Sequence, residues 1–210
     1  MTVLYRDDCL VVCIKPVGAL SEDKGEDSVP ALLRAQLGTD VFAVHRLDRA
    51  VGGVMVYSTD AALTGKLTAS LQNTGEKTYL AVVSGDPGEC GSYTDLLYHD
   101  PKTNKTFVVK RERRGVREAK LDFERKARFS FGEQTLSLAE VHLKTGRTHQ
   151  IRTQFASRGM PLVGDRRYGS RIAADVALWS AGIVFDHPKT KQRMEFFHAP
   201  PDVFPFSLTE

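Results

Sequence analysis

The chain has 210 residues, 41% of them hydrophobic and 26% charged, and a formal net charge of +3. Both fractions are typical of a globular protein, and no run approaches the ~18 apolar residues that a membrane-spanning helix needs. The length predicts one domain, residues 1–210, with room for two lobes. The N-terminus shows no signal-peptide pattern, and the three cysteines form no CxxC pair. We therefore expect a cytoplasmic protein with buried free thiols.

Positive charge is concentrated in one segment. Residues 102–128 contain eleven basic and four acidic side chains, so this segment carries +7 while the whole chain carries only +3. A local field of this kind favours an anionic partner. The alternative is an ordinary solvated face of a hairpin.

The first predicted elements are a strand and a helix. Residues 9–14 form an apolar run that ends at Lys15-Pro16, as a buried strand would. Ser28 suits the N-cap of a helix, Pro30 suits an early helical position, and Gly38 is a typical helix end. The sequence thus predicts a strand followed by a helix between Ser28 and Gly38.

Residues 44–53, Val-His-Arg-Leu-Asp-Arg-Ala-Val-Gly-Gly, are the first stretch with candidate chemistry. Apolar runs on both sides predict two strands joined by a glycine-containing turn. Asp48 lies between Arg46 and Arg49, and nearby cations keep a carboxylate ionised. His45 is a further candidate cation. An ionised carboxylate among cations suits chemistry on an anionic polymer, and the alternative is a surface Arg–Asp pair.

Strands dominate the rest of the predicted elements. We expect a helix over 59–72, a strand over 77–83, hairpin strands over 93–126 with turns at 104–105 and 114–115, a strand pair over 129–143 turning near 132–133, and a last strand pair, 182–185 and 194–197, turning at 187–189.

Residues 143–155 form the second stretch with candidate chemistry. We expect Thr148 to cap a helix there. Arg147 and the free amides of the first turn would bind an anion. His149 and Arg152 are three residues apart, so they would share one face of that turn.

Several familiar catalytic motifs are absent. The sequence contains no HExxH and no close cluster of histidine and cysteine, so we expect no metal site. It contains no Walker loop, no GxGxxG and no GxSxG, which argues against nucleotide hydrolysis, dinucleotide chemistry and serine-hydrolase chemistry. The remaining candidates are Asp48, the second stretch, the basic segment and Tyr79, which would otherwise be a half-buried strand tyrosine.

Both stretches resemble the motifs of a known family. Residues 45–53 resemble the HRLD-x-x-x-x-G motif of the RluA branch of RNA pseudouridine synthases, and residues 146–152, GRTHQIR, resemble the same family's GR(T/S)HQ(I/L)R motif. The resemblance covers nearly the whole chain and includes Lys15-Pro16, residues 77–79 and residues 161–169. It implies a single catalytic domain that isomerises uridine to pseudouridine in ribosomal or transfer RNA, with no cofactor and no metal.

The resemblance also implies a fold. We expect an α+β protein with a mixed, mostly antiparallel sheet flanked by helices and a central basic cleft, acting as a monomer. Many relatives carry an N-terminal S4 RNA-binding module, whereas the catalytic pattern begins here by Leu4. We therefore expect no S4 module, which leaves substrate choice to the surface of the catalytic domain.

The resemblance gives individual residues their roles. Asp48 would attack C1′ of the ribose as the nucleophile. Arg152 would pair with Asp48, and Tyr79 would stack on the base and help to remove the C5 proton. Arg46 would take the place of the flipped base. The other residues expected to contact RNA are His45, Arg49, Arg113, Arg114, Arg147, His149 and Gln150.

The sequence departs from the family's usual pattern in three places. Ile14 replaces an Asn, Val51-Gly52 replace Thr-Ser, and Leu178-Trp179-Ser180 replace Leu-His-Ala. The three catalytic candidates are intact, so the departures concern the geometry of the substrate loop more than the chemistry.

Two other functions stay open at this point. A retaining glycosidase or nucleosidase would use the same nucleophile, but it needs a second carboxylate roughly 5 Å away as the acid, and neither motif offers one. An RNA-binding module without activity would fit the departures at Val51-Gly52 and Trp179.

Overall fold

The computed structural model describes residues 1–207, which divide into two compact units. Unit 1 contains residues 1–77 and 179–199, and unit 2 contains residues 78–178 and the segment from 200. Strands take up 42% of the chain and helices 14%. Parallel and antiparallel strand pairs both occur, and the antiparallel pairs dominate. The predicted α+β fold with a mixed, mostly antiparallel sheet is therefore confirmed, while the central cleft stays a prediction.

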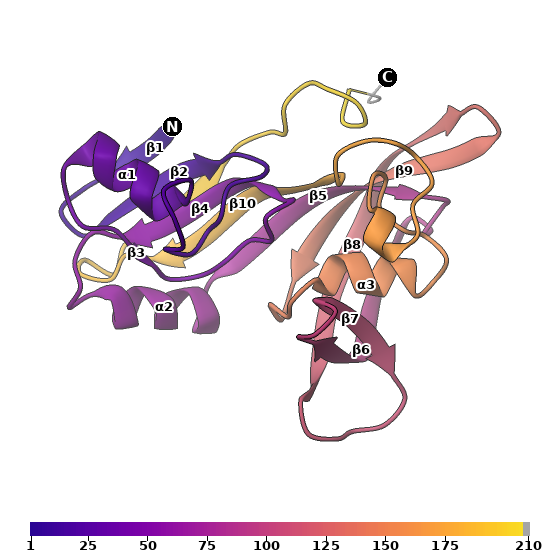
Figure 1. The fold of residues 1–210 in the computed structure, drawn as a ribbon, viewed down its shortest axis with the longest axis horizontal. Coiled ribbons are helices and arrows are strands. Elements are labelled where there is room, and N and C mark those ends of the chain that lie inside the picture. Colours follow the sequence, from indigo (N-terminus) through magenta and orange to yellow (C-terminus); the bar gives the residue numbers. More distant parts are fainter. Residues whose placement is uncertain (208–210) are drawn as a thin grey trace. The chain divides into compact units, whose positions relative to one another are not determined.

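The first candidate stretch connects two strands of unit 1, β3 (Phe42–Ala43) and β4 (Gly52–Ser58) (Figure 1). The other strands of this unit are β1 (Val3–Arg6), β2 (Leu10–Lys15), β10 (Leu178–Asp186) and β11 (Arg193–Phe197). They pair in the order β1-β2-β4-β10-β11, and β3 pairs with the end of β4. The β4–β10 pair is parallel. Every residue of β4 is buried, as expected for a strand that is covered on both faces.

Helix α1 (Val29–Leu37) begins and ends where the sequence predicts. The Oγ of Ser28 accepts a hydrogen bond from the amide of Ala31 at 3.3 Å. Gly38 ends the helix with a φ of 65°, a left-handed conformation that glycine adopts without strain.

Helix α2 (Thr64–Asn73) covers one face of the unit 1 sheet. Leu67 and Leu71 pack with apolar side chains of β2, β4 and β10 in one buried cluster. The helix begins at Thr64, so the prediction of a start at residue 59 is wrong. Asp60 forms a turn before the helix, because its Oδ1 accepts a hydrogen bond from the amide of Ala62 at 2.8 Å. A side chain that binds the nearby backbone in this way competes with helical hydrogen bonds, so the helix begins further along the chain.

Unit 2 contains an antiparallel meander. Its strands are β5 (Glu76–Ser84), β6 (Cys90–Asp100), β7 (Lys105–Val109), β8 (Val116–Phe131) and β9 (Gln134–Leu143). They pair in the order β5-β9-β8-β6-β7. The predicted turns are confirmed, because Asn104, Gly115 and Gly132 all have positive φ between these strands.

Helix α3 (Gln150–Ala156) lies beside β6 and β7 (Figure 1). The rings of Tyr93, Phe123 and Phe155 meet beneath it, with centroids 4.9 to 5.6 Å apart. The predicted cap at Thr148 is wrong. His149 precedes the helix with a φ of 55°, and no side chain caps the first turn.

The structure places the three cysteines and tests the apolar segments. Cys9 and Cys13 are buried free thiols, as predicted, whereas Cys90 is exposed. Burial raises the pKa of the Cys13 thiol to about 12, so this sulfur is protonated. Within residues 1–207, no helix is long and apolar enough to span a membrane.

Candidate active site

The turn that carries Asp48 is fixed by hydrogen bonds on both sides. The amide of Val51 donates to the carbonyl of Asp48 at 3.0 Å, which closes the turn itself. The hydroxyl of Ser21 donates to the carbonyl of Leu47 at 2.9 Å. The amide of Gly18 donates to the carbonyl of Arg49 at 2.8 Å. The segment after β2 therefore holds the turn from both of its ends.

Lys15 closes the turn from inside the fold. Its side chain is fully buried at the end of β2, and its Nζ donates to the carbonyls of Val51 at 2.7 Å, Pro16 at 3.0 Å and Arg49 at 3.3 Å. Burial lowers the pKa of Lys15 to about 8, against an opposing effect of the Asp48 carboxylate. A buried ammonium beneath this turn supplies positive charge to the one carboxylate of the motif.

His45 is not the cation that the sequence suggested. Its Nε2 accepts a hydrogen bond from the amide of Val56 at 3.1 Å. Burial lowers the pKa of His45 to about 3, with a smaller contribution from the charge of Lys77, so the ring is neutral at physiological pH. The structure gives His45 the role of fastening the turn to β4.

The two arginines of the first stretch are exposed. Arg46 lies 3.7 Å from Glu22 with more than half of its side chain accessible, a geometry worth little in stability. The Nε of Arg49 donates to the carbonyl of Gly18 at 2.8 Å. Both guanidinium groups are therefore placed on the surface next to Asp48 in the chain.

The departures from the family pattern fit one another. Gly52 lies opposite Trp179 in the parallel β4–β10 pair. A Cβ on Gly52 would lie 2.5 Å from Cζ3 of Trp179, so the indole occupies the space that a serine side chain would need. The indole N–H of Trp179 donates to the carbonyl of His198 at 2.9 Å, which fixes the ring. The two replacements are thus one compensated change of packing.

Tyr79 and Arg152 belong to unit 2. Tyr79 lies on β5 opposite Val141 of β9 and is 7% exposed. Arg152 projects from α3 and is 5% exposed. Within unit 2 the guanidinium of Arg152 forms an ion pair with Asp165 through two hydrogen bonds: Nε donates to Oδ2 at 2.6 Å, and Nη2 donates to Oδ1 at 2.9 Å. This two-bond fork is the strongest geometry available to an Arg–carboxylate pair.

His149 and Arg152 both contact Tyr168. The ring of Tyr168 lies 5.1 Å from Cζ of Arg152, and its hydroxyl lies 2.9 Å from Nδ1 of His149. The amide of Thr106 donates to the same hydroxyl at 2.8 Å. This contact ties β7 to the start of α3.

Gln150 has a structural role that the sequence did not reveal. Its Oε1 accepts hydrogen bonds from the hydroxyl of Thr145 at 2.8 Å and from the amide of Arg147 at 3.0 Å. Its Nε2 donates to the carbonyl of Lys120 at 3.0 Å. The amide of Arg147 is therefore already engaged, which removes a donor from the expected anion site. The Arg147 side chain remains exposed, with Nε donating to the carbonyl of Glu118.

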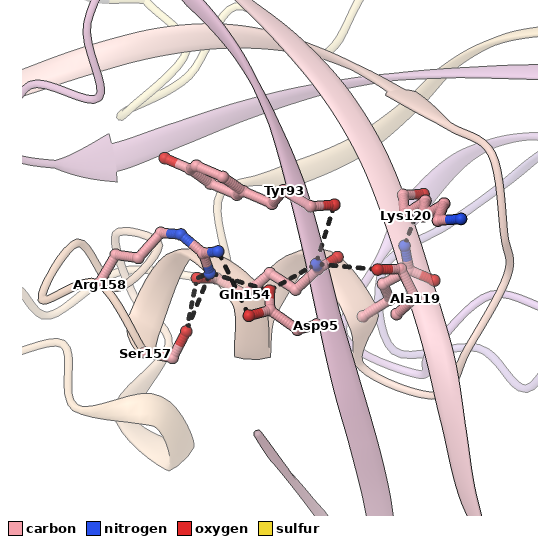
Figure 2. A network of polar contacts seen from close by, with 8 residues as sticks. Tyr93, Asp95, Ala119, Lys120, Gln154, Ser157 and Arg158 are labelled. Atoms are coloured by element: carbon pink, nitrogen blue, oxygen red, sulfur yellow. Dashed lines mark hydrogen bonds and ion pairs between the residues drawn. The ribbon is translucent and has the colours of Figure 1, made fainter. Parts of the chain in front are cut away.

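A polar network anchors the far end of α3 (Figure 2). The Nε2 of Gln154, a fully buried side chain, donates to Oδ2 of Asp95 at 2.7 Å. Arg158 also binds Asp95, at 2.9 Å, and its guanidinium lies 3.8 Å from the ring centroid of Tyr93. These contacts fix the helix that carries Arg152 against β6.

The basic segment, residues 102–128, contains β7 and most of β8, which both pair with β6. Arg113 and Arg114 are exposed in the connection between β7 and β8. Arg113 stacks over the ring of Tyr98 at 4.6 Å, which holds its guanidinium against the strand without neutralising it.

One cluster in unit 1 has the residue types of a metal site. Asp7, Cys9 and His187 offer ligand atoms within 4.8 Å of one another. Their hydrogen bonds are already made: Oδ2 of Asp7 lies 2.9 Å from Nε2 of His187, and Nδ1 of His187 accepts the amide of Thr190. The contact between Asp7 and His187 joins the connection between β1 and β2 to the connection between β10 and β11.

Three residues with a place in these arrangements were given no role from the sequence. Lys15, Asp165 and Tyr168 all lie in segments that resemble the family, but neither charge nor periodicity says what they touch. A lone lysine at the end of an apolar strand and a lone aspartate after Leu-Val-Gly are the available signals. Buried charges require partners, and both side chains have them in the structure.

Comparisons with known proteins agree with these motifs. Residues 9–157 match the family described as RNA pseudouridylate synthase. The "tRNA pseudouridine synthase C" of Haemophilus ducreyi is 29% identical, covering 92% of this chain and 88% of the relative. The "Uncharacterized RNA pseudouridine synthase YlyB" of Bacillus subtilis is 34% identical, covering 93% of this chain and 68% of the relative.

A solved structure shows the same fold. "Human RNA Pseudouridylate Synthase Domain Containing 1" superimposes with a TM-score of 0.80 at 18% identity, covering 96% of this chain and 84% of that one. The matched residues, 9–157, include both candidate stretches, and they extend from unit 1 into unit 2. The chain therefore belongs to the RNA pseudouridylate synthase family, the isomerases that convert uridine in RNA to pseudouridine.

Proposed function

We propose that this enzyme isomerises specific uridines in transfer or ribosomal RNA, with Asp48 as the nucleophile at C1′ of the target nucleotide. Arg152 pairs with Asp48, and Tyr79 stacks on the base and helps to remove the C5 proton. The observation that carries the proposal is the fixed turn around Asp48, whose flanking carbonyls bind Nζ of Lys15. A rigid backbone presents a nucleophile with little freedom to lose.

Exposed basic side chains are the proposed RNA contacts. Arg46 takes the place of the flipped base, and Arg49, Arg147, Arg113 and Arg114 bind phosphates. His45, His149 and Gln150 support this surface through the hydrogen bonds described above. Relatives named tRNA pseudouridine synthase C support transfer RNA as the first class to test.

The location and the oligomeric state are part of the same proposal. The free thiols at positions 9, 13 and 90 support a reducing compartment such as the cytoplasm. We expect a monomer, measured by light scattering of the purified protein with and without RNA.

Release of tritium tests the reaction itself. The base leaves C1′ through N1 and rejoins through C5, so isomerisation replaces the hydrogen on C5. RNA that carries tritium at uridine C5, extracted from cells that lack the protein, should therefore lose tritium to water when the enzyme is added. Sequencing the product for pseudouridine, first in the transfer RNA fraction, identifies the site.

Asp48 is tested in the same assay. Asp48→Ala should abolish tritium release while RNA affinity stays within about tenfold, because a nucleophile contributes mainly after binding. Asp40→Ala, an exposed carboxylate just upstream, is the matched control and should keep normal turnover. Near-normal activity of Asp48→Ala would overturn the assignment, and free uracil without tritium release would identify a glycosidase instead.

A further inference from the structure

The guanidinium of Arg152 is paired with the carboxylate of Asp165, and both groups are buried. Asp165 is 1% exposed and Arg152 is 5% exposed. Both oxygens of Asp165 are used, one on Nε and one on Nη2. A fork of this kind fixes the plane of the guanidinium and its rotation about the side chain, which a single contact would leave free.

Tyr168 fixes the guanidinium from a second direction. Its ring lies 5.1 Å from Cζ of Arg152, and its hydroxyl is anchored by the amide of Thr106. Asp165 precedes one short 3-10 helix, η1 (Arg166–Tyr168), and Tyr168 is its last residue; the amide of Tyr168 donates to the carbonyl of Asp165 at 3.0 Å. The two partners of Arg152 are thus parts of one rigid loop.

We propose that Asp165 is a positioning residue, which with Tyr168 holds the Arg152 guanidinium in the orientation that the reaction requires. The inference rests on the proposed function, since it assumes that Arg152 serves Asp48. Asp165 itself touches neither the substrate nor the reacting atoms. Its removal should slow the chemical step and leave RNA binding intact.

The same helix offers a matched control. At the far end of α3, Arg158 pairs with Asp95 at 2.9 Å and stacks on Tyr93 (Figure 2). This arrangement has the same chemistry, an arginine between a carboxylate and a tyrosine ring. It belongs to the anchoring of the helix, so its loss reports the effect of weakening α3 alone.

The experiment compares Asp165→Asn with Asp95→Asn. For each variant, the single-turnover rate of tritium release and the dissociation constant for the same C5-labelled RNA are measured. Asp165→Asn should lower the rate by about a hundredfold, the cost of a misplaced catalytic group, with the dissociation constant within about threefold of wild type. Asp95→Asn should leave both quantities within about threefold. Asp165→Glu, which restores the charge one methylene further out, should recover part of the rate.

Two results would overturn the inference. A normal rate in Asp165→Asn means that the fork does not position Arg152, and equal losses in both variants mean that Asp165 only stabilises the helix. If circular dichroism shows that Asp165→Asn does not fold, Tyr168→Leu provides the test, because it removes the ring beside Arg152 and keeps the ion pair with Asp165. A slowed rate at normal RNA affinity then supports the inference, and a normal rate rejects it. Failure of the proposed function differs from all of these, because then the wild type releases no tritium.

Discussion

At the scale of residues, a single buried charge, the ammonium of Lys15, holds the turn that carries Asp48 through its hydrogen bonds. Lys15 is fully buried and contributes all of its donors to three carbonyl groups around Asp48. A charged group without water is costly, and it persists only where its hydrogen bonds are made. The lysine therefore couples the order of the turn that carries Asp48 to its own protonation.

The stability of the protein should depend on pH through Lys15. Its pKa is about 8 in the folded chain and 10.5 without the fold. Between these values the unfolded chain binds more protons, so stability from this group rises as pH rises through 8. Between pH 7 and about pH 10, we expect wild type to gain up to about 3 kcal/mol of unfolding free energy relative to Lys15→Met, measured by urea denaturation. If the unfolding free energies of wild type and Lys15→Met changed equally with pH, the prediction would be wrong.

The hydroxyl of Tyr79 is testable separately from its ring. Tyr79→Phe keeps the stacking surface and removes the group that would take part in proton transfer. We expect tritium release to fall by about a hundredfold or more, the usual contribution of a general acid or base, while RNA affinity is unchanged. The control is Tyr98→Phe on β6, which keeps the ring under Arg113 and should retain full activity. Full activity in Tyr79→Phe would remove the hydroxyl from the mechanism.

At the scale of elements, the β4–β10 pair supports the end of the turn that carries Asp48. The indole of Trp179 fills the space beside Gly52, and Gly53 lies against the backbone of Ser180 with a φ of 121°. Neither glycine tolerates a side chain here. Restoring serine at position 52 alone should therefore destabilise the fold, whereas restoring serine at position 52 together with histidine at position 179 should not.

Gly52→Ser should destabilise the protein by roughly 1–3 kcal/mol, the usual cost of overpacking. Adding Trp179→His should recover most of this loss, because the smaller ring vacates the space. Thermal unfolding measures both effects. Gly65→Ser is the control, since a Cβ on Gly65 would meet nothing within 4 Å. An equal loss in the single and double variants would show that the two positions are not coupled.

At the scale of the whole molecule, charge is distributed unevenly. The chain carries +3, while residues 102–128, which contain β7 and most of β8, carry +7. A field of this kind raises local affinity for a polyanion without any net basicity of the protein. We therefore expect the basic residues of 102–128 to determine how RNA affinity responds to salt.

Charge reversal tests the RNA surface. Arg113→Glu with Arg114→Glu should weaken RNA binding and reduce the slope of log affinity against log salt by roughly one to two, because two phosphate contacts are lost. Lys66→Glu with Lys189→Glu makes the same change of charge at exposed positions of unit 1 and is the control. An unchanged slope in the first variant would mean that these arginines do not contact RNA.

The sequence by itself determined the elements whose causes are local. The limits of α1 follow from the cap at Ser28 and from Gly38, and the turns of the hairpins follow from Asn104, Gly115 and Gly132. The two motifs determined the family for the same reason, since they are contiguous in the chain. These features can be predicted without knowing which residues distant in the sequence contact them.

Only the tertiary structure decided what the buried charges and the neutral histidine do. The fork between Asp165 and Arg152, the contact of Lys15 with Val51 and the acceptor role of His45 join residues that are 11 to 36 positions apart. Their states depend on burial, which composition does not give. The start of α2 and the missing cap of α3 were mispredicted because a local hydrogen bond of Asp60 and the left-handed His149 outweighed helix signals.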